Sequence, residues 1–157
     1  MSSLLFSLLN NPDFEEGKLW LRVSQPANAT IFTEGDHSSE VYLVLAGELR
    51  VFGKVDLDDQ RKIQPGFVEL TKGDIFGEMV MFDDSPRSAT VVCITDVELA
   101  VIKADDLFSF LDSHPDCGYP IMKELLSVVV QRLRKANQRI FSLFAWGLKS
   151  KGLDNHL

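Results

Sequence analysis

The fold is decided by one stretch of the sequence, DIFGEMVMFDDSPRSATV, which spans residues 74–91. Its pattern predicts the end of a strand, a short helical turn and the start of another strand. Gly77 allows the backbone to approach a ligand closely, and the residues after it can form a short helix whose first N–H groups lack partners. Such a helix end attracts an anion.

The side chains of this stretch favour a small phosphate bound beside a sugar. Pro86 sets an extended entry to the next segment. Arg87 offers a planar fork of donors that matches two oxygens of one phosphate, and Ser88 adds a hydroxyl donor. The carboxylate of Glu78 repels an anion, so it is better suited to a sugar hydroxyl. Together these groups indicate a nucleotide, and the single arginine indicates a phosphate of low charge.

The run FGEMVMFDDSPRSATV resembles the phosphate-binding cassette of cyclic-nucleotide-binding domains. These domains occur in the catabolite activator/FNR superfamily, in kinase regulatory subunits and in nucleotide-gated channels. The resemblance implies that Glu78 binds the ribose 2′-hydroxyl, that Arg87 binds the cyclic phosphate, and that backbone N–H groups from Gly77 to Met79 complete the anion site. The ligand contacts expected from this stretch are Phe76, Gly77, Glu78, Met79, Val80, Arg87, Ser88 and Ala89.

A purely structural interpretation of the same residues has to be weighed. Arg87 alone is consistent with a surface ion pair to Asp83 or Asp84. Glu78 alone is consistent with a carboxylate favoured by the dipole at a helix start. Their combination with Gly77 at the spacing of the family favours ligand contact.

The composition fits one compact domain. The chain has 157 residues, 45% of them apolar, and a formal charge of −7, which opposes direct DNA binding because phosphate contacts need clustered cations. Cys93 and Cys117 form no CxxC pair and the histidines lie apart, so we expect neither a disulfide framework nor a metal site. The apolar run of residues 4–9 is too short to span a bilayer and has no basic flank. We therefore expect a cytoplasmic protein without a membrane partner.

The chain divides into three parts of a single domain, residues 1–157. We expect an N-terminal helical segment at residues 1–16, an antiparallel jelly-roll-like β-barrel at residues 17–103 with the cassette at 74–91, and C-terminal helices at residues 104–150. The fold class is therefore mainly β with flanking helices. Residues 54–66 mix charges of both signs and predict a solvated loop.

A second segment resembles the same family. The sequences IFTEGD at residues 31–36 and VYLVLAGELRV at residues 41–51 are similar to a turn and a hairpin of these domains. Gly35 and Gly47 supply turn geometry and the apolar positions fill a core, so we assign this segment a structural role. Asn28 and its neighbour stand where the family often has a glycine, in a turn away from the expected pocket.

A helix of about seven turns is predicted from about Pro120, after a break at residues 113–116. We expect a parallel homodimer through an apolar seam on this helix, with a helix docked on the barrel of a monomer as the alternative. The seam, whose residues recur at alternating steps of four and three, consists of Met122, Leu126, Val129, Leu133, Ala136, Ile140 and Leu143. The cations Arg132, Arg134, Lys135 and Arg139 are interpreted as solvated flanks or ion-pair partners.

The resemblance also implies that this helix closes over the nucleotide base, with Asn137 and Arg134 at the base contact. Ala136 stands where one branch of the family has a hydroxyl, and the Ser88 hydroxyl can serve either the phosphate or a guanine edge. The choice of base is therefore open. Cyclic AMP is the first expectation for the ligand, and cyclic GMP follows closely.

The expected function is a non-enzymatic cyclic-mononucleotide sensor that signals through its C-terminal helix to an unidentified downstream protein. The sequence shows no nucleophile–base constellation. Family transcription factors continue into a helix-turn-helix domain, whereas this chain ends after the helix, so a stand-alone sensor is expected. One alternative is a module of the same fold that binds no nucleotide and acts through its helix and its apolar end at Phe141, Phe144 and Trp146. Another is a regulator that acts on DNA only through a partner subunit.

Overall fold

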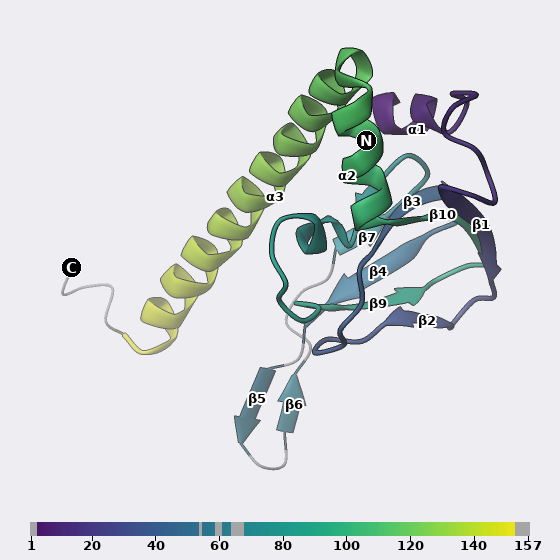
Figure 1. The fold of residues 1–157 in the computed structure, drawn as a ribbon. Coiled ribbons are helices and arrows are strands. Elements are labelled where there is room, and N and C mark those ends of the chain that lie inside the picture. Colours follow the sequence, from purple (N-terminus) through teal and green to yellow (C-terminus); the bar gives the residue numbers. More distant parts are fainter. Residues whose placement is uncertain (1–2, 54, 59–60, 64–67, 153–157) are drawn as a thin grey trace.

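The body of the molecule is a roll of two four-stranded sheets (Figure 1). The structure is a computed structural model that describes residues 3–53, 55–58, 61–63 and 68–152. The first sheet, in spatial order, contains β1 (Trp20–Gln25), β10 (Val97–Lys103), β3 (Glu40–Ala46) and β8 (Ile75–Phe76). The second contains β2 (Thr30–Phe32), β9 (Thr90–Cys93), β4 (Leu49–Phe52) and β7 (Val68–Leu70). The predicted antiparallel jelly-roll-like fold is confirmed, but within the described residues the two sheets do not join into a closed barrel.

The central strand β3 explains why its sequence is apolar at nearly every position. Val41 and Leu43 are buried in a core cluster between the first sheet and the helices. Val44 is buried in a second cluster between the two sheets. Because side chains alternate along a strand, a sheet covered on both faces needs apolar residues at both odd and even positions.

Within the described residues, four helical elements complete the fold. They are α1 (Ser3–Leu8), the 3₁₀ helix η1 (Glu78–Met81), α2 (Ala104–Ser113) and α3 (Pro115–Ser150). The carboxylate of Glu124 on α3 accepts hydrogen bonds from the backbone N–H groups of Leu4, at 2.9 Å, and Leu5, at 3.3 Å. Since these N–H groups have no intrahelical partner, Glu124 fastens the start of α1 to α3.

The last helix begins earlier than the sequence pattern predicts. It starts at Pro115, where a proline is tolerated because the first turn needs no N–H donor. Pro120 lies inside the helix instead of at its beginning. Gly118 is buried against Leu111 of α2, which lets the two helices approach closely at their junction.

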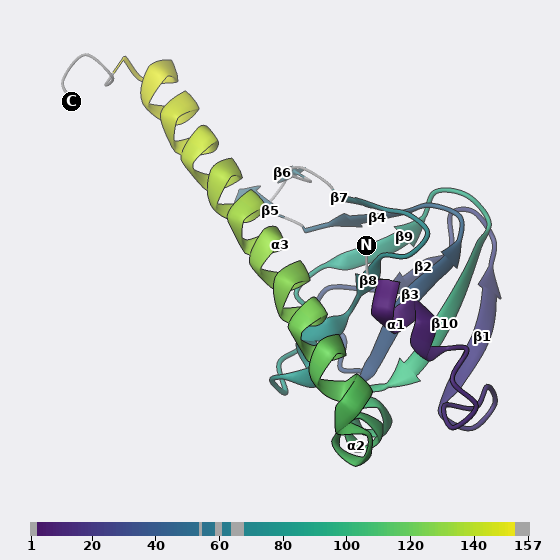
Figure 2. The same cartoon turned by 90° about the horizontal axis from the view of Figure 1, so that it is seen from above.

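The two halves of α3 differ in their surroundings. The first half contacts α1 and α2 and contains the buried residues Ile121 and Leu125. From Leu133 to Trp146 every residue is exposed. Figures 1 and 2 show this second half running past the sheets.

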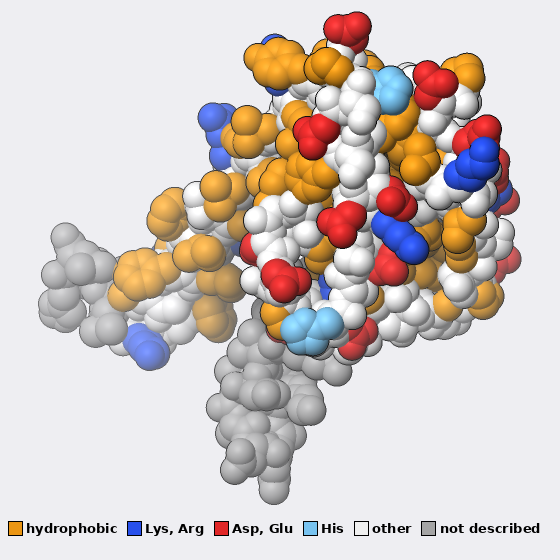
Figure 3. Space-filling view, viewed as in Figure 1, with side chains coloured by type: hydrophobic (Ala, Val, Ile, Leu, Met, Phe, Trp, Pro, Cys, Tyr) orange, Lys and Arg blue, Asp and Glu red, His pale blue; other side chains and the backbone are white. Residues whose placement is uncertain are grey.

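Apolar side chains cover much of the exposed part of α3 (Figure 3). The predicted seam is only partly exposed, because Met122 packs against the core. The exposed large apolar residues from the middle of the helix onward are Leu126, Val130, Leu133, Ile140, Phe141, Leu143, Phe144 and Trp146. The homodimer stays a prediction, and any partner surface would include residues outside the predicted seam.

The predicted loop at residues 54–66 contains the paired strands β5 (Val55–Asp58) and β6 (Arg61–Ile63), and the rest of it lies outside the described residues. Among the described helices, none combines the length and apolar content that a membrane span requires. The subdivision into residues 1–16, 17–103 and 104–150 stays a prediction.

Candidate ligand-binding site

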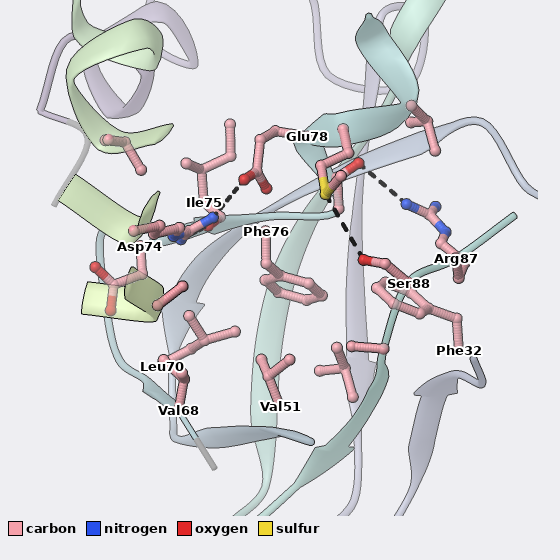
Figure 4. Close-up of a pocket in the computed structure, with 18 of the residues that line it drawn as sticks. Phe32, Val51, Val68, Leu70, Asp74, Ile75, Phe76, Glu78, Arg87 and Ser88 are labelled. Atoms are coloured by element: carbon pink, nitrogen blue, oxygen red, sulfur yellow. Dashed lines mark hydrogen bonds and ion pairs between the residues drawn. The ribbon is translucent and has the colours of Figure 1, made fainter. Parts of the chain in front are cut away.

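A pocket of about 750 Å³ lies between the stretch of residues 74–91, the second sheet and α3. Figure 4 shows Arg87 and Glu78 at one end of this pocket and apolar residues of the second sheet below them. The apolar wall consists of Phe32, Val51, Val68, Leu70, Phe76 and Val91. An apolar cavity with a few polar groups at one end has the general form of a small-molecule site.

Arg87 is buried and held by the roll itself. It is only 5% exposed. Its Nε donates to Ser38 Oγ at 2.7 Å, Nη1 donates to the carbonyl oxygen of Gly77 at 3.0 Å, and Nη2 donates to the carbonyl oxygen of Glu40 at 2.7 Å. The guanidinium also lies 4.2 Å from the centre of the Phe32 ring. These hydrogen bonds use three of its five N–H groups and fix its plane. Nη2 also lies 3.9 Å from Oε2 of the Glu40 carboxylate, an ion pair too long for a hydrogen bond, so two N–H donors remain for a ligand.

Arg87 does not form the surface ion pair with Asp83 or Asp84 that the sequence left open, because its side chain is buried and the carboxylate nearest to it belongs to Glu40. Burial lowers the pKa of its guanidinium below the usual value, and Tyr42, Glu40, Asp36 and Glu78 oppose this shift. An arginine remains protonated in proteins, so the side chain is a cation in a partly desolvated site. Such a cation interacts more strongly with an anion than an exposed one does.

Gly77 makes the position of Arg87 possible. Its backbone is left-handed, with φ 72°, and it stands directly before η1, the short helical turn predicted from the sequence. A Cβ at this position would lie 2.8 Å from Arg87 Nη1 and 3.2 Å from the Tyr42 ring. Only glycine therefore fits both the conformation and the space.

Glu78 is paired with α3 and not with the roll. It is 6% exposed, and its Oε1 accepts a hydrogen bond from Arg132 Nη1 at 2.7 Å. Arg132 Nη2 also donates to the carbonyl oxygen of Ile75. Arg132 is one of the four cations interpreted from the sequence as solvated flanks or ion-pair partners, and the spacing along one helix does not indicate which of them meets Glu78.

The structure brings together the ligand contacts predicted from residues 74–91. Phe76, Gly77, Glu78, Met79, Val80, Arg87, Ser88 and Ala89 all line the pocket. Ser88 is exposed, and its Oγ lies 3.6 Å from the sulfur of Met79 (Figure 4). Phe76 stacks on Tyr42 with ring centres 4.9 Å apart, which fixes the floor of the pocket beneath Arg87.

The structure does not bring Asn137 or Arg134 to the pocket. The helix presents Val128, Gln131, Arg132, Lys135, Ala136 and Arg139 instead. These positions recur at steps of three and four, as expected for one face of a helix. Asn137 and Arg134 fall on other faces, and their predicted contact with the base would require another arrangement of α3.

The described residues contain no group of three or more His, Cys, Asp or Glu side chains that could hold a metal ion. Cys93 is buried, as expected for a small apolar residue, and burial raises the pKa of its thiol.

Comparisons with known proteins agree with the geometry of the pocket. A family model described as "Cyclic nucleotide-binding domain" matches residues 22–114. The chain is 28% identical over 121 residues to a CRP-like cAMP-activated global transcriptional regulator of Mycobacterium tuberculosis, covering 77% of this chain and 50% of that protein. It is 30% identical over 112 residues to a cyclic AMP receptor protein of Thermus thermophilus, covering 71% and 48%. The chain thus spans about half the length of these relatives.

Two solved structures also resemble the fold of this chain over most of its length. The catabolite activator protein of Thermus thermophilus superposes with a TM-score of 0.67 at 25% identity, covering 91% of this chain and 60% of that one. A cyclic nucleotide-binding domain from Methylobacillus flagellatus superposes with a TM-score of 0.68 at 29% identity, covering 79% and 67%.

Proposed function

This chain belongs to the cyclic nucleotide-binding domain family, and we propose that it is a non-enzymatic sensor that binds one cyclic mononucleotide in the pocket beside Arg87. The observation that carries the proposal is the buried guanidinium of Arg87, which keeps two N–H donors beyond its three contacts with the protein. The names of several relatives include cyclic AMP, so cyclic AMP is the first ligand to test.

The phosphate would bind at the Arg87 end of the pocket. A planar guanidinium can donate two parallel hydrogen bonds to two oxygens of one phosphate. Ser88, which lines the same end, would add a hydroxyl donor. A cyclic phosphodiester carries one negative charge, which this single buried cation can balance.

The ribose would bind at Glu78. The hydrogen bond from Arg132 occupies Oε1 of this carboxylate, and Oε2 would accept a hydrogen bond from the 2′-hydroxyl. Ligand and helix would then share one side chain. Because a ligand shifts an equilibrium only through contacts that differ between two states, this shared carboxylate supports a signal that passes from the ribose to α3.

The signal would reach a partner through the exposed half of α3. An isolated helix of this length is marginally stable in water, so an apolar and fully exposed half helix calls for a covering surface. A second copy of the chain is the simplest partner, because its α3 presents the same apolar face. The downstream protein would bind this dimer.

Calorimetric titration with cyclic AMP and then cyclic GMP tests the proposal, with Arg87→Ala as the control variant. We expect saturable binding that weakens by at least about 1.5–3 kcal/mol in the variant, because a charge-assisted pair is lost. Undiminished affinity in the folded variant would refute the assignment of Arg87.

A second function is favoured if folded wild-type protein binds neither nucleotide. The exposed apolar half of α3 would then support an interaction module that kept the fold without the ligand. Analytical ultracentrifugation, with and without nucleotide, would show an assembly that is indifferent to the ligand in that case.

A further inference from the structure

The choice between adenine and guanine depends on the side of the pocket that the base would reach. With the phosphate at Arg87 and the ribose at Glu78, the base extends toward the apolar wall that includes Val51 and Leu70 (Figure 4). These aliphatic side chains pack against the flat face of either purine and do not distinguish between them. Recognition of the polar edge of the base therefore falls to the polar side chains that line the pocket, among them those of α3.

Among the described residues of α3, three cations line the pocket on that side. Arg132 is engaged by Glu78 and Ile75. Lys135 and Arg139 also line the pocket, one helical turn apart, and in the part of the chain that the structure describes neither has a carboxylate partner. Their N–H groups remain available to a ligand that carries acceptor atoms.

The two purines differ in what they offer to such donors. Guanine presents the neighbouring acceptors O6 and N7, whereas adenine presents N7 beside an amino group that is itself a donor. Lysine and arginine donate and cannot accept, so they match the guanine edge and oppose the adenine amino group.

We propose that Lys135 and Arg139 recognise the base through O6 and N7 and make this pocket selective for cyclic GMP over cyclic AMP. The inference rests on the proposed function and departs from the sequence-based ranking that placed cyclic AMP first. It also replaces Asn137 and Arg134, which lie on other faces of α3, as the base contacts within one chain.

The other polar groups near the base do not alter this preference. The carboxylate of Glu69 lies 3.6 Å from the guanidinium of Arg50. It would accept a hydrogen bond from the amino group of either purine. The amide of Gln131 both donates and accepts, so it suits either base. Among the described residues of α3 that line the pocket, Lys135 and Arg139 are the donor-only side chains that no hydrogen bond engages, and we expect them to set the preference.

Titration of the wild-type protein with cyclic GMP, cyclic AMP and cyclic IMP tests the inference. Cyclic IMP keeps O6 and N7 but lacks the 2-amino group of guanine. We expect cyclic GMP and cyclic IMP to bind with similar affinity, and both about tenfold more tightly than cyclic AMP, near the lower end of the discrimination a base contact gives. If cyclic IMP binds like cyclic AMP, the 2-amino group decides the selectivity and the inference is overturned.

Variants on two faces of the same helix provide the matched comparison. Lys135→Ala should bring the affinities for cyclic GMP and cyclic AMP together, Lys135→Arg should retain the difference, and Arg134→Ala should leave it unchanged although it removes the same charge. An equal effect of Lys135→Ala and Arg134→Ala would indicate general electrostatics and contradict base recognition.

The inference and the proposed function fail in different ways. Binding of all three nucleotides with equal affinity, or a preference for cyclic AMP, overturns the role of Lys135 and Arg139 while the sensor function stands. Binding of none of them by the folded wild-type protein removes the sensor function itself.

Discussion

The two ionised side chains at the end of the pocket are held by different parts of the molecule. Arg87 is fixed by Ser38 and by the carbonyl oxygens of Gly77 and Glu40, all within the roll. Glu78 is held across the pocket by Arg132 of α3. The Arg87 end is therefore preformed, whereas the Glu78 end depends on where α3 lies.

This difference separates affinity from signalling. A preformed cation lowers the cost of binding because little has to be ordered when the ligand arrives. A carboxylate shared with a helix instead makes the helix position part of the binding equilibrium. Changes at the Arg87 end should alter stability and affinity, and changes at the Glu78 end should alter the coupling to α3.

Removal of the Arg87 side chain should have the largest effect. In Arg87→Ala the carbonyl oxygens of Gly77 and Glu40 lose their donors in a buried site, so we expect a loss of about 2–3 kcal/mol in the free energy of unfolding, besides the weaker binding. Urea unfolding followed by circular dichroism measures it. Arg87→Lys should keep the positive charge but restore little stability, because an ammonium cannot reproduce the planar fork of donors. An unchanged urea midpoint in Arg87→Ala would contradict a structural role for these hydrogen bonds.

A methyl group at Gly77 should disturb the same end by a smaller amount. Gly77→Ala places a side chain in a left-handed conformation and brings its Cβ within 2.8 Å of Arg87 Nη1, so we expect a loss of about 1–2 kcal/mol in stability together with weaker nucleotide binding. Gly17→Ala is the matched control, because Gly17 has φ +88° but no atom within 4 Å of the added Cβ. The control should lose stability without losing affinity. Equal affinity losses in both variants would show that contact with Arg87 is irrelevant.

The Glu78–Arg132 pair should contribute less, since Arg132 is partly exposed, with 35% of its side chain accessible. A double-mutant cycle of Glu78→Gln and Arg132→Gln should give a coupling energy of about 0.5–1.5 kcal/mol, a range that allows for solvent screening. Amide hydrogen exchange should be faster in the second half of α3 in either variant and unaffected in β3. Faster exchange throughout the roll would show that the pair stabilises the whole fold and does not specifically position the helix.

The contrast between the two ends also explains what the sequence predicts well. The cassette, the preceding strand and the turn at Gly77 are local, so their spacing predicts Arg87, Glu78 and their neighbours in the pocket. The three hydrogen-bond partners of Arg87 come from residues 38–77. The β3–β8 pairing and the backbone hydrogen bonds of Arg87 with residues 35 and 36 together bring Ser38 and Glu40 to it. No local pattern could supply them.

The helix shows the limits of local patterns more clearly. Its apolar period predicts a long helix, but not that Met122 packs on the core while Leu126 is exposed. Arg132 and Arg134 are chemically alike and two residues apart. Only the direction in which α3 crosses the roll assigns Arg132 to Glu78 and places Arg134 outside the pocket.

The smallest expected effect is a pH dependence at Tyr42, which belongs to the Arg87 end. Burial raises the pKa of its phenol, and Glu40 raises it further, while Arg87 acts in the opposite direction. The unfolded chain releases this proton near the usual pKa of about 10, whereas the folded chain keeps it to higher pH. The contribution to stability is therefore complete below about pH 10 and is lost as the pH rises through the folded pKa.

Urea midpoints measured between pH 8.5 and 11 should fall less steeply in Tyr42→Phe than in the wild-type protein, because phenylalanine keeps the stacking on Phe76 without an ionisable group. Arg132→Gln should not change the wild-type slope, since Tyr42 and its charged neighbours belong to the roll. A slope altered by Arg132→Gln would mean that α3 also controls the Arg87 end. The separation between a preformed phosphate end and a helix-dependent ribose end would then be incorrect.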